Sequence, residues 1–216
     1  KMKTLPDFQS ATYLHRRARL IQTIRSQTGG GVFILGTAPE SLRNRDSEYA
    51  YRHDSDFYYL TGFTEPQSLL VIQVNPDSAV THLFCRPKDL EREIWDGLRL
   101  GPEQAISQLG VDHAYPFLEV NERLPNLMAN YQHLYSRLGA SADVDASLRT
   151  WLSALNSQVR QGVKKPTQFH DLEAIVHEYR LVKDAEEIAI MRRAGQISAQ
   201  AHLAAMSASQ AGLKEY

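Results

Sequence analysis

Apolar residues recur at helical spacing after residue 7 and predict a helix that ends at the three glycines of residues 29–31. The apolar face of this helix is expected to consist of Leu14, Ala18, Ile21 and Ile24. Arg16, Arg17 and Arg19 are expected on its other faces, because charged side chains are usually exposed.

Short apolar runs rich in β-branched residues predict strands at residues 32–35, 69–74 and 80–84. The turn-forming sequence Asn-Pro-Asp-Ser at 75–78 predicts that the last two form a hairpin. Further patterns predict helices at 89–95, 102–109, 120–130 and 145–159, and strands near 111–115 and 133–136. This alternation, together with the hairpin, predicts a three-layer α/β domain with a mixed β-sheet flanked by helices.

The C-terminal part of the sequence predicts the start of a second domain. Gly and Pro interrupt the periodicity at residues 161–166 and mark a linker before the final helices. A long helix is predicted from Asp184 to about residue 207, with Asp184 and Glu187 in capping-box spacing and Gly212 as its break.

Residues 213–216 predict the first turn of another helix, which is too short to be stable alone. We therefore expect the chain to be the front part of a longer protein. Residues 1–180 are expected to form the first domain, and residues 181–216 the first helix of a second, truncated one.

Composition and charge narrow the class of protein. Of the 216 residues, 43% are hydrophobic and 23% charged, which is typical of a globular domain. The formal net charge of −1 gives no field that would attract nucleic acid or an anionic membrane, so neither is expected as a partner. The single cysteine, Cys85, excludes an internal disulfide, and the first thirty residues lack the apolar core of a signal peptide. A soluble cytoplasmic protein is the expectation.

Two histidine-containing clusters could carry chemistry. Residues 53–56, His-Asp-Ser-Asp, combine metal-binding side chains, but adjacent residues on a regular element cannot all point at one ion. The alternative is that Asp54 or Ser55 caps a short helical segment at 57–60. His177 lacks the second histidine of a zinc-protease motif, because position 181 is Leu. No Gly-x-Ser-x-Gly motif occurs, and Cys85 has no cationic neighbour in sequence except Arg86, so nucleophilic catalysis is disfavoured.

Trp95 is the most unusual residue of the chain in its context. It lies among Glu91, Arg92, Glu93 and Asp96, and a large aromatic side chain in so polar a setting often anchors a partner or ligand. The alternative is that Trp95 folds back on its own domain. Asp46 and Arg160 lie in loop-like sequence, where a binding role and a solvated surface charge both stay open.

Several segments resemble the N-terminal domain of bacterial Xaa-Pro aminopeptidases (aminopeptidase P). They are residues 46–52, 55–63, Glu65-Pro66, 89–97, 99–101, His177-Glu178, Arg180, 186–188 and 192–195. The ordered matches span nearly the whole chain, which makes the resemblance more specific than a short motif. It implies a fold like that of the N-terminal domain of creatinase and aminopeptidase P, followed by a pita-bread catalytic domain.

In this family the catalytic domain holds two divalent metal ions, usually manganese, with two Asp, one His and two Glu. The resemblance places all these ligands in motifs after Tyr216, so no metal ligand and no catalytic residue is expected in this chain. It implies metal-dependent hydrolysis of the bond before proline in peptides with proline in the second position. Proline needs a dedicated pocket because it lacks an N–H group and fixes its own φ. A homo-oligomer, either a dimer or a tetramer, is also implied.

The resemblance further implies that N-terminal-domain residues complete the substrate pocket, some of them from a neighbouring subunit. Trp95 would pack on the proline side of the substrate, Asp46 would line the polar rim near the free amine, and Arg160 would orient the peptide. The chain alone is predicted to be inactive. Two alternatives stay open: a prolidase or creatinase relative with another substrate class, and a pseudoenzyme that binds peptides or proteins without cleaving them.

Overall fold

The computed structural model describes residues 10–214, which divide into two units. The first unit ends at Val176 and the second begins at His177. The helices are α1 (Ser10–Thr28), α2 (Ser55–Thr61), α3 (Leu90–Asp96), α4 (Gly101–Leu109), α5 (Val120–Met128), α6 (Ala142–Ser157), α7 (Glu173–Leu181) and α8 (Ala185–Ala208), with short 3-10 turns η1 (Phe117–Glu119) and η2 (Val159–Gln161). The strands are β1 (Gly31–Gly36), β2 (Leu42–Asn44), β3 (Ser47–Glu48), β4 (Leu69–Val74), β5 (Ala79–Cys85), β6 (His113–Pro116), β7 (His133–Ser136) and β8 (Gln168–Asp171).

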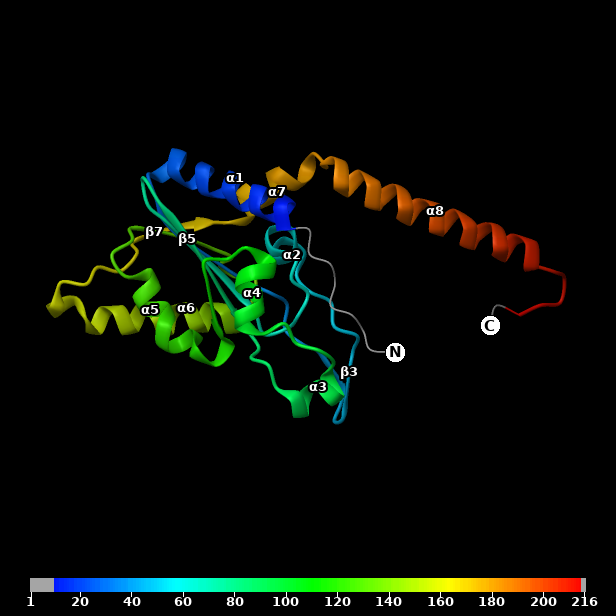
Figure 1. The fold of residues 1–216 in the computed structure, drawn as a ribbon, viewed down its shortest axis with the longest axis horizontal. Coiled ribbons are helices and arrows are strands. Elements are labelled where there is room, and N and C mark those ends of the chain that lie inside the picture. Colours follow the sequence, from blue (N-terminus) through cyan, green and yellow to red (C-terminus); the bar gives the residue numbers. More distant parts are fainter. Residues whose placement is uncertain (1–9, 215–216) are drawn as a thin grey trace. The chain divides into compact units, whose positions relative to one another are not determined.

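The first unit is built on a mixed six-stranded sheet in the order β6-β5-β4-β1-β7-β8 (Figure 1). The neighbours β1–β4 and β4–β5 are antiparallel, whereas β5–β6, β1–β7 and β7–β8 are parallel. The predicted hairpin is confirmed, since β4 and β5 pair from Leu69–Phe84 to Val74–Ala79.

Helices cover both faces of this sheet, which confirms the predicted three-layer architecture. On one face, α5 and α6 close over a buried core of Val32, Ile34, Leu69, Val71, Phe84, Val120, Leu124, Met128, Leu134, Leu148, Trp151 and Leu155. On the other face α1 contacts β1 and β4, and α4 contacts β5 and β6. The central strands are buried from both sides, so they carry continuous apolar runs.

The buried face of α1 differs from the prediction. Leu20 and Ile24 are fully buried, but Leu14 is 42% exposed and Ala18 is exposed. Arg16 and Arg17 are buried instead, against the expectation that they lie outside. The physical reason is hydrogen bonding, which compensates the burial of a guanidinium group.

Arg17 connects three elements. Its guanidinium donates to the carbonyl of Leu60 at 2.9 Å, to Leu109 at 2.7 Å and to Gly110 at 2.8 Å. These carbonyls lie at the C-terminal ends of α2 and α4, where helices leave backbone acceptors unpaired. Burial lowers the pKa of Arg17 to about 10, with the charge of Asp112 acting in the opposite direction. Arg16 lies over the ring of Tyr59, 4.1 Å from its centroid.

Four other elements, namely β2, β3, β8 and α7, were not predicted as such. The β2–β3 hairpin is wholly exposed, and β8 is an exposed polar strand at the sheet edge. Helix α7 follows β8 directly, its first backbone N–H bonded to Asp171 Oδ1. Residues 162–167 connect η2 to β8.

The second unit contains α8, whose predicted start is confirmed. Asp184 accepts from the Glu187 N–H and the Glu187 carboxylate accepts from the Asp184 N–H, which completes the capping box. The predicted helical turn at 213–216 is not present at Leu213 and Lys214, and Glu215 and Tyr216 lie outside the described residues. Among residues 10–214, none of the helices combines the length and apolar character that a bilayer crossing requires.

Arg17→Met is expected to lower the free energy of unfolding of residues 1–216 by about 3 kcal/mol, because it leaves three buried carbonyls without their donor. Arg149→Met, on an exposed turn of α6, is the control and is expected to change stability by less than about 0.5 kcal/mol. Urea unfolding measures both variants. Equal effects would show that the Arg17 hydrogen bonds do not hold α2 and α4.

Candidate functional site

Trp95 lies on α3, a helix that buries none of its residues. Its side chain is 85% exposed, and Leu90 and Ile94 on the same helix are each 79% exposed. The structure therefore excludes the alternative in which Trp95 folds back on its own domain. An exposed group of large apolar side chains on a surface helix is typical of a binding surface.

Local capping explains why α3 forms where it does. The Asp89 side chain accepts from the Arg92 N–H at 3.1 Å, and Gly97 ends the helix with φ 87°, donating its N–H to the Glu93 carbonyl. Beyond the helix, Arg99 Nη2 lies 2.8 Å from Asp96 Oδ2. The sequence pattern predicted this helix correctly to within one residue at each end.

Residues 86–100, which we call the Trp95 arm, connect β5 to α4 and include α3. Both ends of the arm contact Glu65, a residue of the loop after α2. Glu65 Oε1 accepts from the Leu100 N–H at 2.7 Å, and Glu65 Oε2 lies 3.4 Å from Arg86 Nη2. In Figure 1 the arm, marked by α3, projects from the body of the first unit.

Asp46 lies in the turn of the β2–β3 hairpin. Its N–H donates to Asn44 Oδ1 at 3.1 Å, which leaves its exposed carboxylate at the tip of the hairpin. A hollow of about 420 Å³ at the base of the hairpin is lined by Ala38, Pro39, Ser41, Tyr49, Ala50, Tyr51 and Arg52. In the view of Figure 1 the hairpin and α3 project at the same end of the first unit.

Arg160 is placed elsewhere in the first unit. It lies in η2, after α6, and is exposed. Figure 1 shows α6 with α5, away from α3 and β3. In this view the Trp95 arm and the β2–β3 hairpin project at the same end of the first unit, and α6, which precedes Arg160, lies away from them.

The cluster at residues 53–56 is a helix cap, as the alternative interpretation proposed. Asp54 Oδ1 accepts from the N–H groups of Asp56 and Phe57 at 2.9 and 2.8 Å and thereby caps α2. The ring of His53 lies against Tyr58, with centroids 4.6 Å apart. Burial, more than the nearby Arg52 charge, lowers the pKa of His53.

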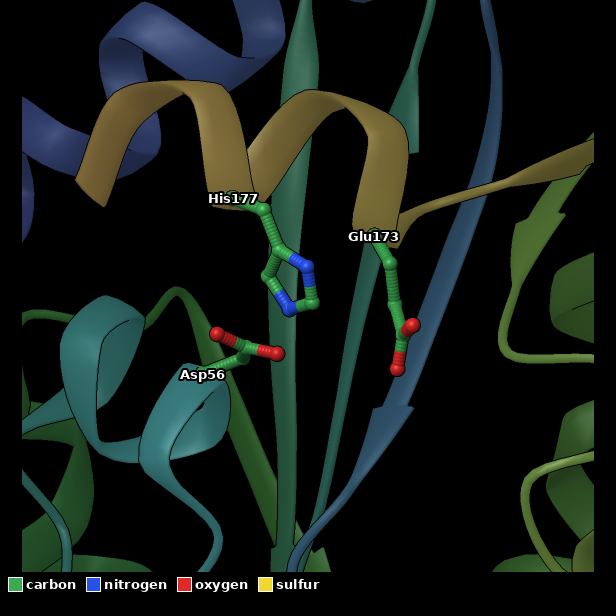
Figure 2. A group of neighbouring side chains, drawn as sticks. All are labelled: Asp56, Glu173 and His177. Atoms are coloured by element: carbon green, nitrogen blue, oxygen red, sulfur yellow. The ribbon is translucent and has the colours of Figure 1, made fainter. Parts of the chain in front are cut away.

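Arg137 forms ion pairs with three neighbouring carboxylates. Its Nη1 lies 2.7 Å from Asp54 Oδ2, its Nε lies 2.8 Å from Glu173 Oε1, and its Nη2 pairs with Asp56. Figure 2 shows Asp56 at the start of α2 and Glu173 in the first turn of α7, where His177 follows one turn later. Burial opposes the charge on Arg137, but bonding to Asp54 and Asp56 outweighs it and raises the pKa. Each of these three carboxylates therefore has the Arg137 cation as a partner.

Cys85 is unsuited to nucleophilic catalysis. It is fully buried at the end of β5, and burial, supported by the nearby Glu65 charge, raises the pKa of its thiol to about 12. The thiolate is the reactive form, so this cysteine is expected to be inert in the folded chain.

The sequence pattern gave no indication of the contacts at the base of the Trp95 arm. Glu65 stood out only as part of the Glu65-Pro66 pair within the family resemblance. A charge pattern could not have joined Glu65 to Arg86 and Leu100, because they lie 21 and 35 residues away.

The comparisons with known proteins all indicate the same family. Residues 13–135 match the family model described as "Aminopeptidase P, N-terminal domain". Xaa-Pro aminopeptidase of Escherichia coli strain K12 is 40% identical over 206 residues, which cover 94% of this chain and 46% of that protein. The Haemophilus influenzae protein of the same name is 33% identical over 93% of this chain and 44% of its own length.

Solved structures agree with these relatives. A variant of Escherichia coli aminopeptidase P superposes with a TM-score of 0.91 at 39% identity, covering 98% of this chain and 48% of that one. Proline aminopeptidase P II from Yersinia pestis superposes with a TM-score of 0.90 at 41% identity, over 96% and 47% of the two chains. This chain therefore spans about half the length of the relatives it matches.

The exposure of Trp95 can be tested with the two tryptophans of residues 1–216. Trp151 is 4% exposed and donates to Asn121 Oδ1 at 2.9 Å, so it should be shielded. Acrylamide is expected to quench the fluorescence of Trp151→Phe, which retains Trp95, several-fold more strongly than that of Trp95→Phe. Similar quenching of the two variants would mean that Trp95 is covered.

Proposed function

Because this chain belongs to the aminopeptidase P N-terminal domain family, we propose that it is the N-terminal part of a metal-dependent Xaa-Pro aminopeptidase. The longer protein would release the first residue from peptides with proline in the second position. In this proposal the chain supplies substrate-pocket residues and assembly contacts. The hydrolytic centre lies in polypeptide outside residues 1–216.

The observation that supports the proposal best is the exposure of Trp95 on an arm attached through polar contacts. A tryptophan in this position offers an aromatic face to a partner at little further ordering cost, because its helix is already capped at both ends. Proline presents a flat apolar ring and no N–H, so an aromatic face suits it better than a hydrogen-bonding wall. Trp95 would therefore pack on the proline side of the substrate.

Asp46 and Arg160 take different parts in the proposal. The exposed carboxylate of Asp46, near the free amine of a peptide, would contribute an ion pair at the pocket rim. Arg160, a cation with a planar donor group, would orient the peptide. Since Arg160 lies apart from α3 within one chain, we propose that it acts on a pocket formed with a neighbouring subunit.

The metal ions and the assembly state complete the proposal. Two divalent ions, manganese by family resemblance, would activate water and polarise the carbonyl before proline when bound to the longer protein. A homo-oligomer, a dimer or a tetramer, and a cytoplasmic location are proposed with it. Metal analysis and sedimentation of the full-length protein test the first two.

A second candidate is a prolidase relative, and a third is a pseudoenzyme that binds peptides without cleaving them. Assay of the metal-loaded full-length protein separates them. Turnover of Xaa-Pro peptides longer than two residues supports the aminopeptidase. Binding without turnover would favour the pseudoenzyme.

Trp95→Ala in the full-length protein is expected to lower kcat/KM for an Xaa-Pro peptide by about tenfold or more, the effect of losing one well-packed aromatic contact. Trp95→Phe should retain most of the activity because it keeps an aromatic face. Leu118→Ala is the control, since Leu118 is an 88% exposed apolar residue on η1. Unchanged kinetics of Trp95→Ala would remove Trp95 from the substrate pocket.

A further inference from the structure

Helix α3, the middle of the Trp95 arm, has almost no apolar packing of its own. Helix α3 buries none of its residues, and the large apolar side chains it carries face solvent. A helix of 7 residues is far too short to be stable alone. Its position is therefore set by the ends of the arm, where Leu100 is buried, and by polar contacts such as that of the Glu93 side chain, 7% exposed, with Lys88 at 3.9 Å.

Glu65 contacts both ends with a single carboxylate. One oxygen accepts from the backbone N–H of Leu100, where the arm enters α4, and the other pairs with Arg86, where the arm leaves β5. The side chains of Glu65 and Arg86 are 12% and 11% exposed, so solvent screens this pair only partly. One side chain thus fixes the distance between the ends of a loop whose middle carries Trp95.

Neighbouring contacts close the same base. Arg99 is buried and donates to the Pro87 carbonyl at 3.5 Å, while it also pairs with Asp96 at the end of α3. Gly101 has φ 75°, and a Cβ there would lie 2.9 Å from Lys88 Cγ. The chain segments that enter and leave the arm therefore lie directly against each other.

This base is poorly arranged for stability alone. Burial raises the pKa of Glu65, although the Leu100 N–H and the Arg86 charge act in the opposite direction. The Nε atoms of Arg86 and Arg99 are buried without a hydrogen-bond partner. A buried charge held at a net cost is a poor stabiliser, and such groups concentrate at functional sites.

We propose that Glu65 is a positioning residue that holds the Trp95 arm in the geometry in which Trp95 meets the substrate. This inference rests on the proposed role of Trp95. Glu65 itself does not touch substrate, because its carboxylate is directed to Arg86 and Leu100. Its ionised form is the one that pairs with Arg86 and so holds both ends of the arm.

A double-mutant cycle in the metal-loaded full-length protein tests this inference. Glu65→Gln keeps an acceptor for the Leu100 N–H but loses the ion pair with Arg86, and it is expected to lower kcat/KM for an Xaa-Pro peptide about tenfold through misplacement of Trp95. In the Trp95→Ala background the same change should have no further effect. Asp112→Asn is the matched control, since Asp112 also accepts a backbone N–H, that of Thr81, at 2.7 Å, away from the arm.

The dependence of kcat/KM on pH gives a second readout, which would not change if Glu65 had only a structural role. Because the folded pKa of Glu65 is raised, the ionised pair with Arg86 is lost as the pH falls through that value. On acidification, wild-type kcat/KM should therefore show a step, that is, a fall at a pH above the ordinary pKa of a glutamate carboxyl group. That step should be absent from Glu65→Gln and from Trp95→Ala, and present in Asp112→Asn.

Stability should depend on pH in the opposite sense. A carboxylate with a raised folded pKa favours the folded state most below its unfolded pKa, and this contribution is lost as the pH rises through the folded pKa. The unfolding free energy of Glu65→Gln relative to wild type is therefore expected to rise between acidic and neutral pH. If Glu65→Gln is then at least as stable as wild type at neutral pH, its reduced activity there does not reflect general unfolding.

The outcomes separate the two proposals. If Trp95→Ala impairs activity but Glu65→Gln does not, or if their effects multiply, Glu65 does not act through the arm and this inference is wrong while the proposed function stands. If Trp95→Ala has no effect, the proposed role of Trp95 and this inference both fail, while the aminopeptidase activity is tested separately by turnover. Non-additive losses together with the missing acidic step support both.

Discussion

The carboxylate of Glu65 joins the two ends of a segment whose helix buries none of its residues. A chain segment that buries no apolar helix face depends on polar contacts for its position, and polar contacts are directional and few. Here both oxygens of one side chain are used, one for the backbone at Leu100 and one for Arg86. We propose that the presentation of Trp95 depends on this arrangement.

The position of Glu65 is itself set by α2, which arginines hold at both ends. Arg137 pairs with Asp54 and Asp56 at the N-terminus of α2, and Arg17 donates to the Leu60 carbonyl near its C-terminus. At the C-cap, Gly62 has φ 70°, and a Cβ there would clash with the ring of Tyr13 on α1. Contacts between the sheet, α1 and α2 therefore fix the loop that carries Glu65, three residues beyond Gly62.

The sequence predicted the elements that depend on local periodicity. It failed for features that depend on contacts between residues far apart in the chain. The β4–β5 hairpin, the arm helix and the start of α8 follow from turn residues, capping residues and spacing within a few positions. The buried face of α1 was predicted wrongly, because an arginine is expected to be exposed. Arg17 is buried only because its guanidinium donates to carbonyls 43 and 92 residues away in the sequence. The β2–β3 hairpin and β8 carry mostly exposed side chains, so no apolar pattern marks them.

The candidate site shows the same division. Trp95 was identifiable because a tryptophan among charges is unusual in any sequence, and its exposure agrees with a binding role. The contacts of Glu65 could not be predicted, because pairing in space with Arg86 leaves no periodic trace. Arg160 lies in η2, which follows α6, and the distance of α6 from α3 is visible only in the folded chain.

Backbone hydrogen exchange of full-length wild type and Glu65→Gln at neutral pH tests most directly whether Glu65 fixes the arm. The account predicts that exchange at residues 87–100 becomes at least about tenfold faster in the variant while the amides of β4 are unchanged, which is the signature of local opening. Unchanged exchange in the arm, or an equal increase throughout β4, would contradict it.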